Sequence, residues 1–196
     1  MIKQLVWLIL FIGLTGDSIS SATTLHYDIV MKDKVIGSLD THKRTKGDLT
    51  TYESFTSIKT KLLTKIEVDY KYDVAFNKSL LRKAKVSIVV NNKQHAETST
   101  LWKDQQYQII KNNRESSIQD PIQYTTILMY FKEPKQIKHC YSEQDGTMNT
   151  IIPLGNNSYK KINANGKENI YFYKNGTLQK ASIDGGLVDF ELILRE

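Results

Sequence analysis

Apolar and polar residues alternate along most of this chain, which is the pattern of β-strands with one buried face. The longest alternation covers the eleven residues 66–76, and its apolar positions are Ile66, Val68, Tyr70, Tyr72, Val74 and Phe76. Charged residues occupy most of the positions between them, so one face of the predicted strand would be exposed to solvent. Strands are usually about 5–6 residues long. A longer strand with one solvent-exposed face therefore favours a strongly curved sheet or an open barrel.

Further alternating segments occupy residues 25–31, 84–90 and 188–194, and short turn sequences separate the segments. Two of these turns, Asn91-Asn92 and Asn175-Gly176, have the residue types that tolerate the positive φ angles of tight hairpins. Strand-plus-turn units of about 8–12 residues then predict a mainly all-β fold, an antiparallel sheet of about nine to eleven strands. We expect the polar strand at residues 94–102 to be an edge strand or an exposed strand of this sheet.

One helix is predicted, between Asp120 and Glu133. Asp120 can cap its first turn, Pro121 suits that turn, and Glu133-Pro134 ends it because a residue before proline avoids the helical region. Its buried stripe would consist of Ile122, Thr125, Ile127, Leu128 and Phe131. We expect this helix to cover one mouth of the curved sheet, and we interpret residues 112–119 before it as a loop.

The first 22 residues have the pattern of a secretory signal peptide. Lys3 precedes a run of ten residues, 5–14, that is apolar apart from Gly13, and small residues lead to a cleavage site after Ala22. Ten residues are too few to cross a hydrocarbon core, which needs about 20. We therefore predict a signal peptide at residues 1–22 and a single β-rich domain at residues 23–196. The mature protein would be periplasmic or secreted, with no membrane span.

Charge and cysteine content exclude some classes of protein. The formal net charge is +6, but acidic and basic residues are interspersed and no long block of like charge occurs, so nucleic acid is not an expected partner. Cys140 is the only cysteine, which rules out a disulfide within one chain. His139 is its neighbour on a predicted strand and would point to the opposite face. We therefore interpret Cys140 as a small buried side chain rather than a nucleophile.

No catalytic or metal-binding signature is present. The four histidines, His26, His42, His95 and His139, lack the short spacings of zinc ligands, and we predict no metal and no cofactor. Glu67 and Asp69 share a strand face, but the same face carries several other charges, which indicates a solvated surface. The sequence therefore favours a non-enzymatic protein. A hydrolase acting on envelope polymers remains an alternative, and it would need a cleft that joins a histidine to one of these carboxylates.

The aromatic residues Tyr70, Tyr72 and Phe76 are the candidate binding residues, because they would share the concave face of the best-defined strand. Two interpretations stay open. The rings fill a packed core, or they line a cavity that binds a lipid or another apolar or amphipathic molecule. A further alternative is a structural or protein-interaction module of the cell envelope that contacts an envelope protein through the edge expected at residues 94–102.

Four segments carry a resemblance to a known family: residues 27–29 with 36–39, 72–86, 128–134 and 171–178. In these segments the chain resembles an uncharacterised family of exported β-rich domains of unknown function from Gram-negative bacterial envelopes. The resemblance implies an exported β-rich fold and assigns no activity and no catalytic residue. More distantly, a curved sheet with a covering helix is similar to periplasmic lipoprotein carriers of the LolA/LolB type. That likeness concerns the fold only and implies lipid binding weakly.

Overall fold

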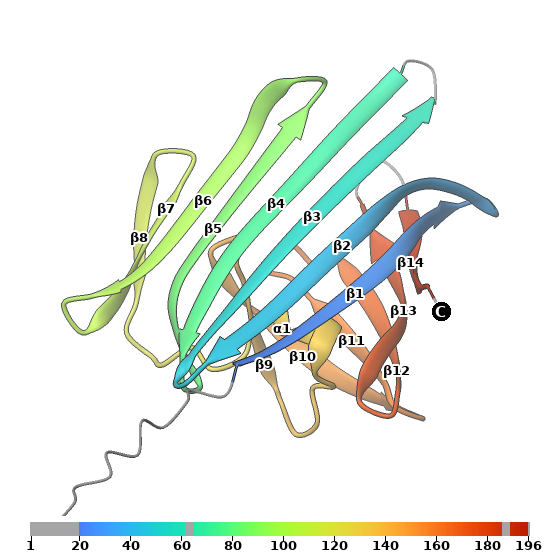
Figure 1. Ribbon diagram of the computed structural model, residues 1–196. Helices are drawn as coiled ribbons and strands as arrows, with labels where there is room; N and C mark the ends of the chain where they lie inside the picture. Colours follow the sequence, from blue (N-terminus) through green and yellow to red (C-terminus); the bar gives the residue numbers. More distant parts are fainter. Residues whose placement is uncertain (1–19, 62–64, 186–188, 196) are drawn as a thin grey trace, which may run out of the picture.

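The computed structural model describes residues 20–61, 65–185 and 189–195, which form a fourteen-stranded antiparallel sheet and one short helix (Figure 1). The elements are β1 (Ser20–Met31), β2 (Lys34–Lys46), β3 (Leu49–Lys61), β4 (Lys65–Asn77), β5 (Leu80–Val90), β6 (Lys93–Lys103), β7 (Gln106–Lys111), β8 (Arg114–Ile118), α1 (Leu128–Phe131), β9 (His139–Ser142), β10 (Thr147–Gly155), β11 (Ser158–Ile162), β12 (Glu168–Lys174), β13 (Thr177–Asp184) and β14 (Asp189–Leu194).

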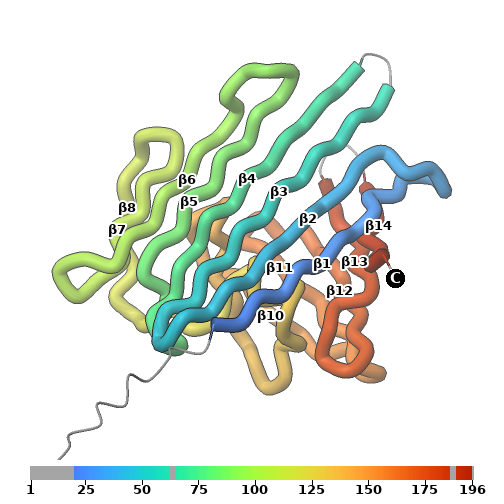
Figure 2. The backbone as a smooth tube through the Cα atoms, in the orientation of Figure 1, coloured from blue at the N-terminus to red at the C-terminus, as the bar shows by residue number. Residues whose placement is uncertain are grey.

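Almost every strand pairs with its neighbours in the sequence. The order is β8-β7-β6-β5-β4-β3-β2-β1-β14-β13-β12-β11-β10-β9, so β1 joins β14 in the middle while β8 and β9 lie at the two edges. Figures 1 and 2 show the long strands β1–β5 in front of β9–β14, so the sheet curls until its two halves face each other. The sheet is not closed, and the fold is an open, barrel-like one, as the alternation predicted.

The predicted number of strands, about nine to eleven, is wrong, because the described residues form fourteen. Several strands have polar residues at buried positions, including Thr41 in β2 and both Ser54 and Thr56 in β3. These strands show no clear alternation in the sequence. Residues 114–118, interpreted as part of a loop, form β8. The polar strand expected to be an edge strand or an exposed strand is β6. It is not an edge, because it pairs with both β5 and β7, but it is exposed at Lys93, Gln94, His95 and Glu97.

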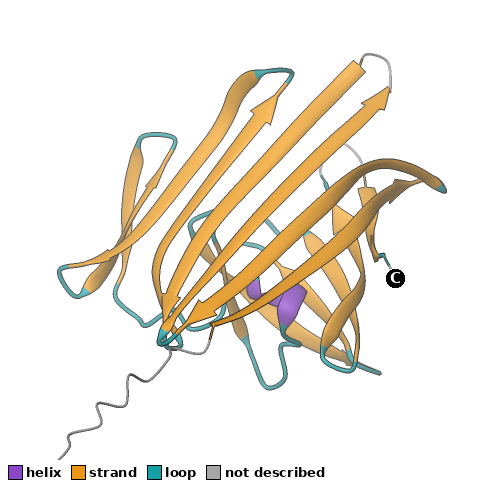
Figure 3. Ribbon diagram, viewed as in Figure 1, coloured by secondary structure: helices purple, strands orange, loops and turns teal. Residues whose placement is uncertain are grey.

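The expected covering helix is mostly absent, since α1 has only four residues (Figure 3). The segment before it pairs with neighbouring chain segments instead of forming helical hydrogen bonds. Ile122 N donates to the Tyr107 hydroxyl, and Ile122 O accepts from Leu81 N. Tyr124 O accepts from Tyr141 N. Together with α1 this stretch forms an interior segment, residues 119–131, between the two halves of the sheet. Ile122, Ile127 and Met129 of this interior segment belong to the hydrophobic core.

Two local predictions are confirmed. Asn91 and Asn92 have φ angles of 48° and 62°, and Asn175 and Gly176 have 53° and 80°, as their hairpin turns require. In β4 the predicted apolar face points inward. Val74 and Phe76 are buried in the core, and the apolar residues before them, from Val68 on, pack against it.

The predicted signal peptide lies mostly outside the described residues, which begin at Ser20. Ser20 to Ala22 form the exposed start of β1 and pair with Arg44 to Lys46 of β2. Within the described ranges, none of the helical residues form a segment with the length and hydropathy of a membrane span. Export and cleavage after Ala22 stay predictions.

Candidate functional site

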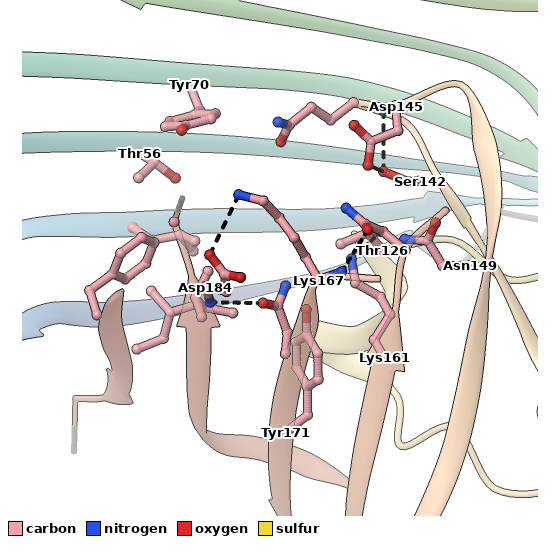
Figure 4. Close-up of a pocket in the computed structure, with 18 of the residues that line it drawn as sticks. Thr56, Tyr70, Thr126, Ser142, Asp145, Asn149, Lys161, Lys167, Tyr171 and Asp184 are labelled. Atoms are coloured by element: carbon pink, nitrogen blue, oxygen red, sulfur yellow. Dashed lines mark hydrogen bonds and ion pairs between the residues drawn. The ribbon is translucent and has the colours of Figure 1, made fainter. Parts of the chain in front are cut away.

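A pocket of about 340 Å³ lies between the two halves of the sheet. Strands β2–β4 and β14 supply one side, and β9–β13 together with the interior segment supply the other (Figure 4). A volume of this size is within the range of small-molecule sites, roughly 300–1,000 Å³. The pocket exists because the sheet curls without closing, which leaves the inner face of its long strands partly uncovered.

One side of the pocket is mainly apolar and aromatic. Leu39, Thr56 and Tyr70 lie side by side across β2, β3 and β4, since Leu39 pairs with Thr56 and Thr56 pairs with Tyr70. Phe190 and Leu192 of β14 extend this surface. The strand register therefore places one continuous row of inward-facing side chains along this wall. Such a wall suits the apolar part of a ligand.

The opposite side contains a buried cation, Lys161 of β11. The side chain is only 7% exposed, and its Nζ donates a hydrogen bond to Thr126 Oγ1 at 3.2 Å. The same nitrogen lies 6.0 Å from the centre of the Tyr171 ring, at the outer limit of a cation–π contact. Among the described residues, no carboxylate oxygen lies within 4.0 Å of it. Lys161 is therefore a buried charge with one direct hydrogen bond and no ion-pair partner there.

The acidic groups nearest this cation already have partners of their own. Glu143 is fully buried, and its two oxygens accept hydrogen bonds from the backbone N–H groups of Thr126 and Ile127 at 3.0 and 3.1 Å. Asp145 accepts hydrogen bonds from Ser142 Oγ at 2.9 Å and Lys111 Nζ at 3.4 Å. Neither carboxylate forms an ion pair with the buried lysine.

The charge state of Lys161 follows from opposing effects. Burial by itself lowers the pKa of the Lys161 ammonium, whereas the neighbouring Tyr171, Cys140 and Glu143 raise it, and the resulting pKa lies above the usual value for lysine. Lys161 therefore carries a positive charge at neutral pH. Burial raises the pKa of Glu143, so its carboxylate is less readily ionised than an exposed one.

Asn149 of β10 is the second unusual polar residue of this wall. It is 2% exposed, and neither its side-chain oxygen nor its side-chain nitrogen has a hydrogen-bond partner. Figure 4 shows Asn149 and Lys161 together on one side of the pocket, with Thr56 and Tyr70 on the other. An unpaired buried amide costs about 1–3 kcal/mol. The pocket therefore contains hydrogen-bonding capacity that the described residues leave unused.

The structure brings two of the three predicted binding residues to this pocket. Tyr70 and Tyr72 line it, and the Tyr72 hydroxyl donates to Gln144 Oε1 at 3.2 Å. Phe76 is 3% exposed and does not line the pocket. It packs edge-on against Tyr52 in the core, with 5.8 Å between ring centres. Strand β4 thus passes from the pocket at its middle to the packed core at its end.

The sequence reasoning missed Lys161 and Asn149. A faint signal existed in residues 159–163, where alternation places Lys161 on the same strand face as Tyr159. A lysine on an apolar face is unusual, because lysine is rarely fully buried without a partner. No comparable signal marked Asn149, which is 2% exposed on the inner face of β10.

The residues considered for catalysis do not assemble at the pocket. No histidine lines it, and Glu67 forms an ion pair with Lys59 at 2.7 Å away from it. His26 contacts Asp40 at 2.5 Å, also outside the pocket. Cys140 is fully buried, and burial raises the pKa of its thiol to about 12, which keeps the thiol protonated. Within the described ranges, no three or more His, Cys, Asp or Glu residues come together as a metal site.

Comparisons with known proteins agree with this fold. A search among curated proteins found no match. Among solved structures, the chain is similar to a β-barrel-like protein of domain of unknown function DUF1849 from Brucella abortus. The TM-score is 0.51 at 10% sequence identity, and the match covers 88% of this chain and 95% of the other. This likeness shows the fold alone, and a likeness to LolA/LolB-type carriers stays a prediction.

The sequence profile of one family spans nearly the whole described sheet, from Tyr27 in β1 to Arg195 after β14. That family is described as a domain of unknown function, DUF6134. Because the match covers residues 27–195, the chain belongs to the DUF6134 family.

Proposed function

We propose that this protein is an exported, non-enzymatic envelope protein that binds an amphipathic small molecule in the pocket between the two halves of its sheet. The observation that carries the proposal is the two-sided lining of the pocket. An aromatic and aliphatic wall with Tyr70 and Leu192 faces a polar wall with Lys161 and Asn149. A ligand with an apolar body and a polar end would match both walls at once.

The packing around the pocket supports a preformed site. The interior segment is attached to both halves of the sheet. Leu81 N of β5 donates to Ile122 O at 2.9 Å, and the Tyr173 hydroxyl of β12 donates to Met129 O at 2.9 Å. Thr126 N donates to Tyr141 O at 2.9 Å. Because these contacts fix the walls of the pocket without a ligand, binding would not carry the free-energy cost of ordering the site.

The proposal is tested with the delipidated mature protein and N-phenyl-1-naphthylamine, a neutral fluorescent probe of apolar sites. Thr56→Trp would fill the pocket from its apolar wall, because Thr56 is buried there and forms no side-chain hydrogen bond with the described residues. Phe55→Trp is the matched control, since Phe55 is on the same strand, points outward and is 50% exposed.

We expect the wild type and Phe55→Trp to bind the probe equally and Thr56→Trp to bind it at least about tenfold more weakly, because a filled cavity cannot admit the ring system. Circular dichroism would show whether Thr56→Trp is folded. A wild-type protein that does not bind the probe, or a folded Thr56→Trp variant that binds it as well as the wild type, would refute the proposal.

A protein-interaction module is the second candidate, and the open sheet supports it. The outer edge of β9 is covered, because Tyr141 exchanges backbone hydrogen bonds with Tyr124 and Thr126. Strand β8 has exposed residues from Arg114 to Ser117, and within the described part of the chain it pairs with β7 alone. An uncovered edge can accept a strand from another protein. Capture of an envelope protein that is lost with Ser117→Pro would favour this function, because the alternation of the ladder with β7 points the N–H of Ser117 outward.

A further inference from the structure

We infer that the pocket recognises the anionic end of its ligand, a single carboxylate or phosphate group on an apolar chain, through Lys161 and Asn149. The inference rests on the proposed function and assigns the chemical class of the ligand. Its basis is the geometry of the polar wall, where a buried cation and a buried amide both lack the partners that such groups normally have.

The first step concerns charge. A buried ammonium is stable only when it is paired, because removing it from water costs several kcal/mol. Lys161 has three N–H donors and uses one of them, on Thr126 Oγ1. The neighbouring carboxylates of Glu143 and Asp145 are held by other donors. An anion from outside the chain would supply the missing partner.

The second step concerns Asn149, which is an independent observation. Its side-chain N–H₂ group is buried, has no partner and borders the same pocket. The strand register places the two residues close together. Ile151 pairs with Lys161, and Asn149 is two residues before Ile151 on the same face of β10. A carboxylate can accept from an ammonium and an amide simultaneously, since each of its oxygens accepts two hydrogen bonds.

The third step concerns the rest of the ligand. Opposite the polar wall, Leu39, Tyr70 and Leu192 present a surface for an apolar chain. Lys161 is the single unpaired cation among the described residues that line the pocket, which matches one anionic head group, because a second buried anionic group would have no cation of its own. The geometry therefore selects an amphipathic anion over a neutral lipid.

The test compares three ligands that share a linear alkyl group of the same length and differ in the head group: dodecanoate, dodecyl phosphate and the neutral dodecanol. Each would displace N-phenyl-1-naphthylamine from the delipidated mature protein. We expect wild type to bind at least one of the two anions at least about tenfold more tightly than dodecanol, because hydrogen bonds to charged groups contribute about twice as much as neutral ones. The anion that binds with the higher affinity identifies the head group.

Lys161→Met keeps the length of the side chain and removes the charge. It is expected to abolish the preference for the anion while binding of dodecanol is unchanged. Lys160→Met is the matched control, because Lys160 is the adjacent residue on the outer face and pairs with Glu168 at 2.6 Å. It should behave like wild type. If Lys161→Met does not fold, the comparison of anion and alcohol in the wild type decides the question by itself.

The possible results separate the two proposals. Equal affinity for dodecanol and both anions in the wild type would overturn the inference and leave the proposed function standing. A preference for an anion that survives in folded Lys161→Met would also overturn it. If the wild type binds neither the probe nor any of the three ligands, both proposals fail.

Discussion

The hydroxyl group of Tyr107 in β7 accepts a hydrogen bond from the backbone N–H of Ile122 at 3.2 Å. It donates its own hydrogen to Leu81 O at 3.1 Å, and the tyrosine is 1% exposed. One buried hydroxyl thus links the start of the interior segment to two strands of the sheet. This link helps to decide that residues 119–127 cross the interior as an extended segment rather than forming a helix.

Tyr107→Phe should therefore lower the free energy of unfolding by about 1–3 kcal/mol, because it leaves the buried N–H of Ile122 without an acceptor. Urea unfolding followed by tryptophan fluorescence measures the change. Tyr52→Phe is the control, since the Tyr52 hydroxyl has no hydrogen-bond partner among the described residues. A loss no larger than that of the control would contradict the role given to Tyr107.

Asn149→Leu should raise the stability of the unliganded protein, because it replaces an unpaired buried amide by an apolar group of similar size. Asn169→Leu should lower the stability, since Asn169 Oδ1 accepts a hydrogen bond from Asp184 N at 2.9 Å. Thermal unfolding of both variants beside the wild type measures the two shifts. If both asparagine variants are destabilised alike, Asn149 has a partner that this account lacks.

Gly37 is required by a close approach between β2 and β3. A Cβ atom at this position would lie 2.1 Å from the backbone oxygen of Ser57, and neither backbone can move freely within the sheet. Gly37→Ala should cost about 1–3 kcal/mol or more. Gly47→Asn is the control, because open space surrounds this turn glycine and asparagine tolerates its φ of +57°. Equal urea midpoints for the two variants would contradict the expectation.

Cys140 should be unreactive in the folded protein. Burial raises the pKa of its thiol to about 12, and only the thiolate is a nucleophile. Labelling with a chromogenic disulfide reagent at pH 8 should therefore be slow in buffer and fast in a denaturing concentration of urea. Rapid stoichiometric labelling without urea would show that the thiol is exposed or activated, and would reopen a catalytic role for it.

Alkaline pH should destabilise the protein. Burial raises the pKa values of Tyr52 and Tyr159 to about 12, whereas tyrosine in an unfolded chain titrates near 10. Between these values the folded state binds more protons than the unfolded state, so stability falls as the pH rises. Melting temperatures at pH 8, 10 and 11 should decrease in that order. Tyrosinate absorbance with a midpoint near pH 10 in the folded protein would disagree with this account.

Much of the fold could be predicted because it depends on local chemistry. The alternation at residues 66–76 gave a strand with its apolar face inward, and the structure confirms β4. Asn91-Asn92 and Asn175-Gly176 form tight turns because these residue types accept positive φ angles. Both properties belong to a few neighbouring residues, so they are visible before any tertiary contact is known.

The sequence by itself determined an antiparallel β fold and placed Tyr70 and Tyr72 on an inner face, whereas the tertiary structure decided which inner-facing side chains border a pocket. Phe76 shares their strand face but lies in the packed core against Tyr52. Lys161 and Asn149 became a candidate site only because the curling of the sheet brings their strands to one pocket and buries both side chains. Burial and missing partners arise from segments far apart in the chain, and a residue pattern along one strand does not contain them.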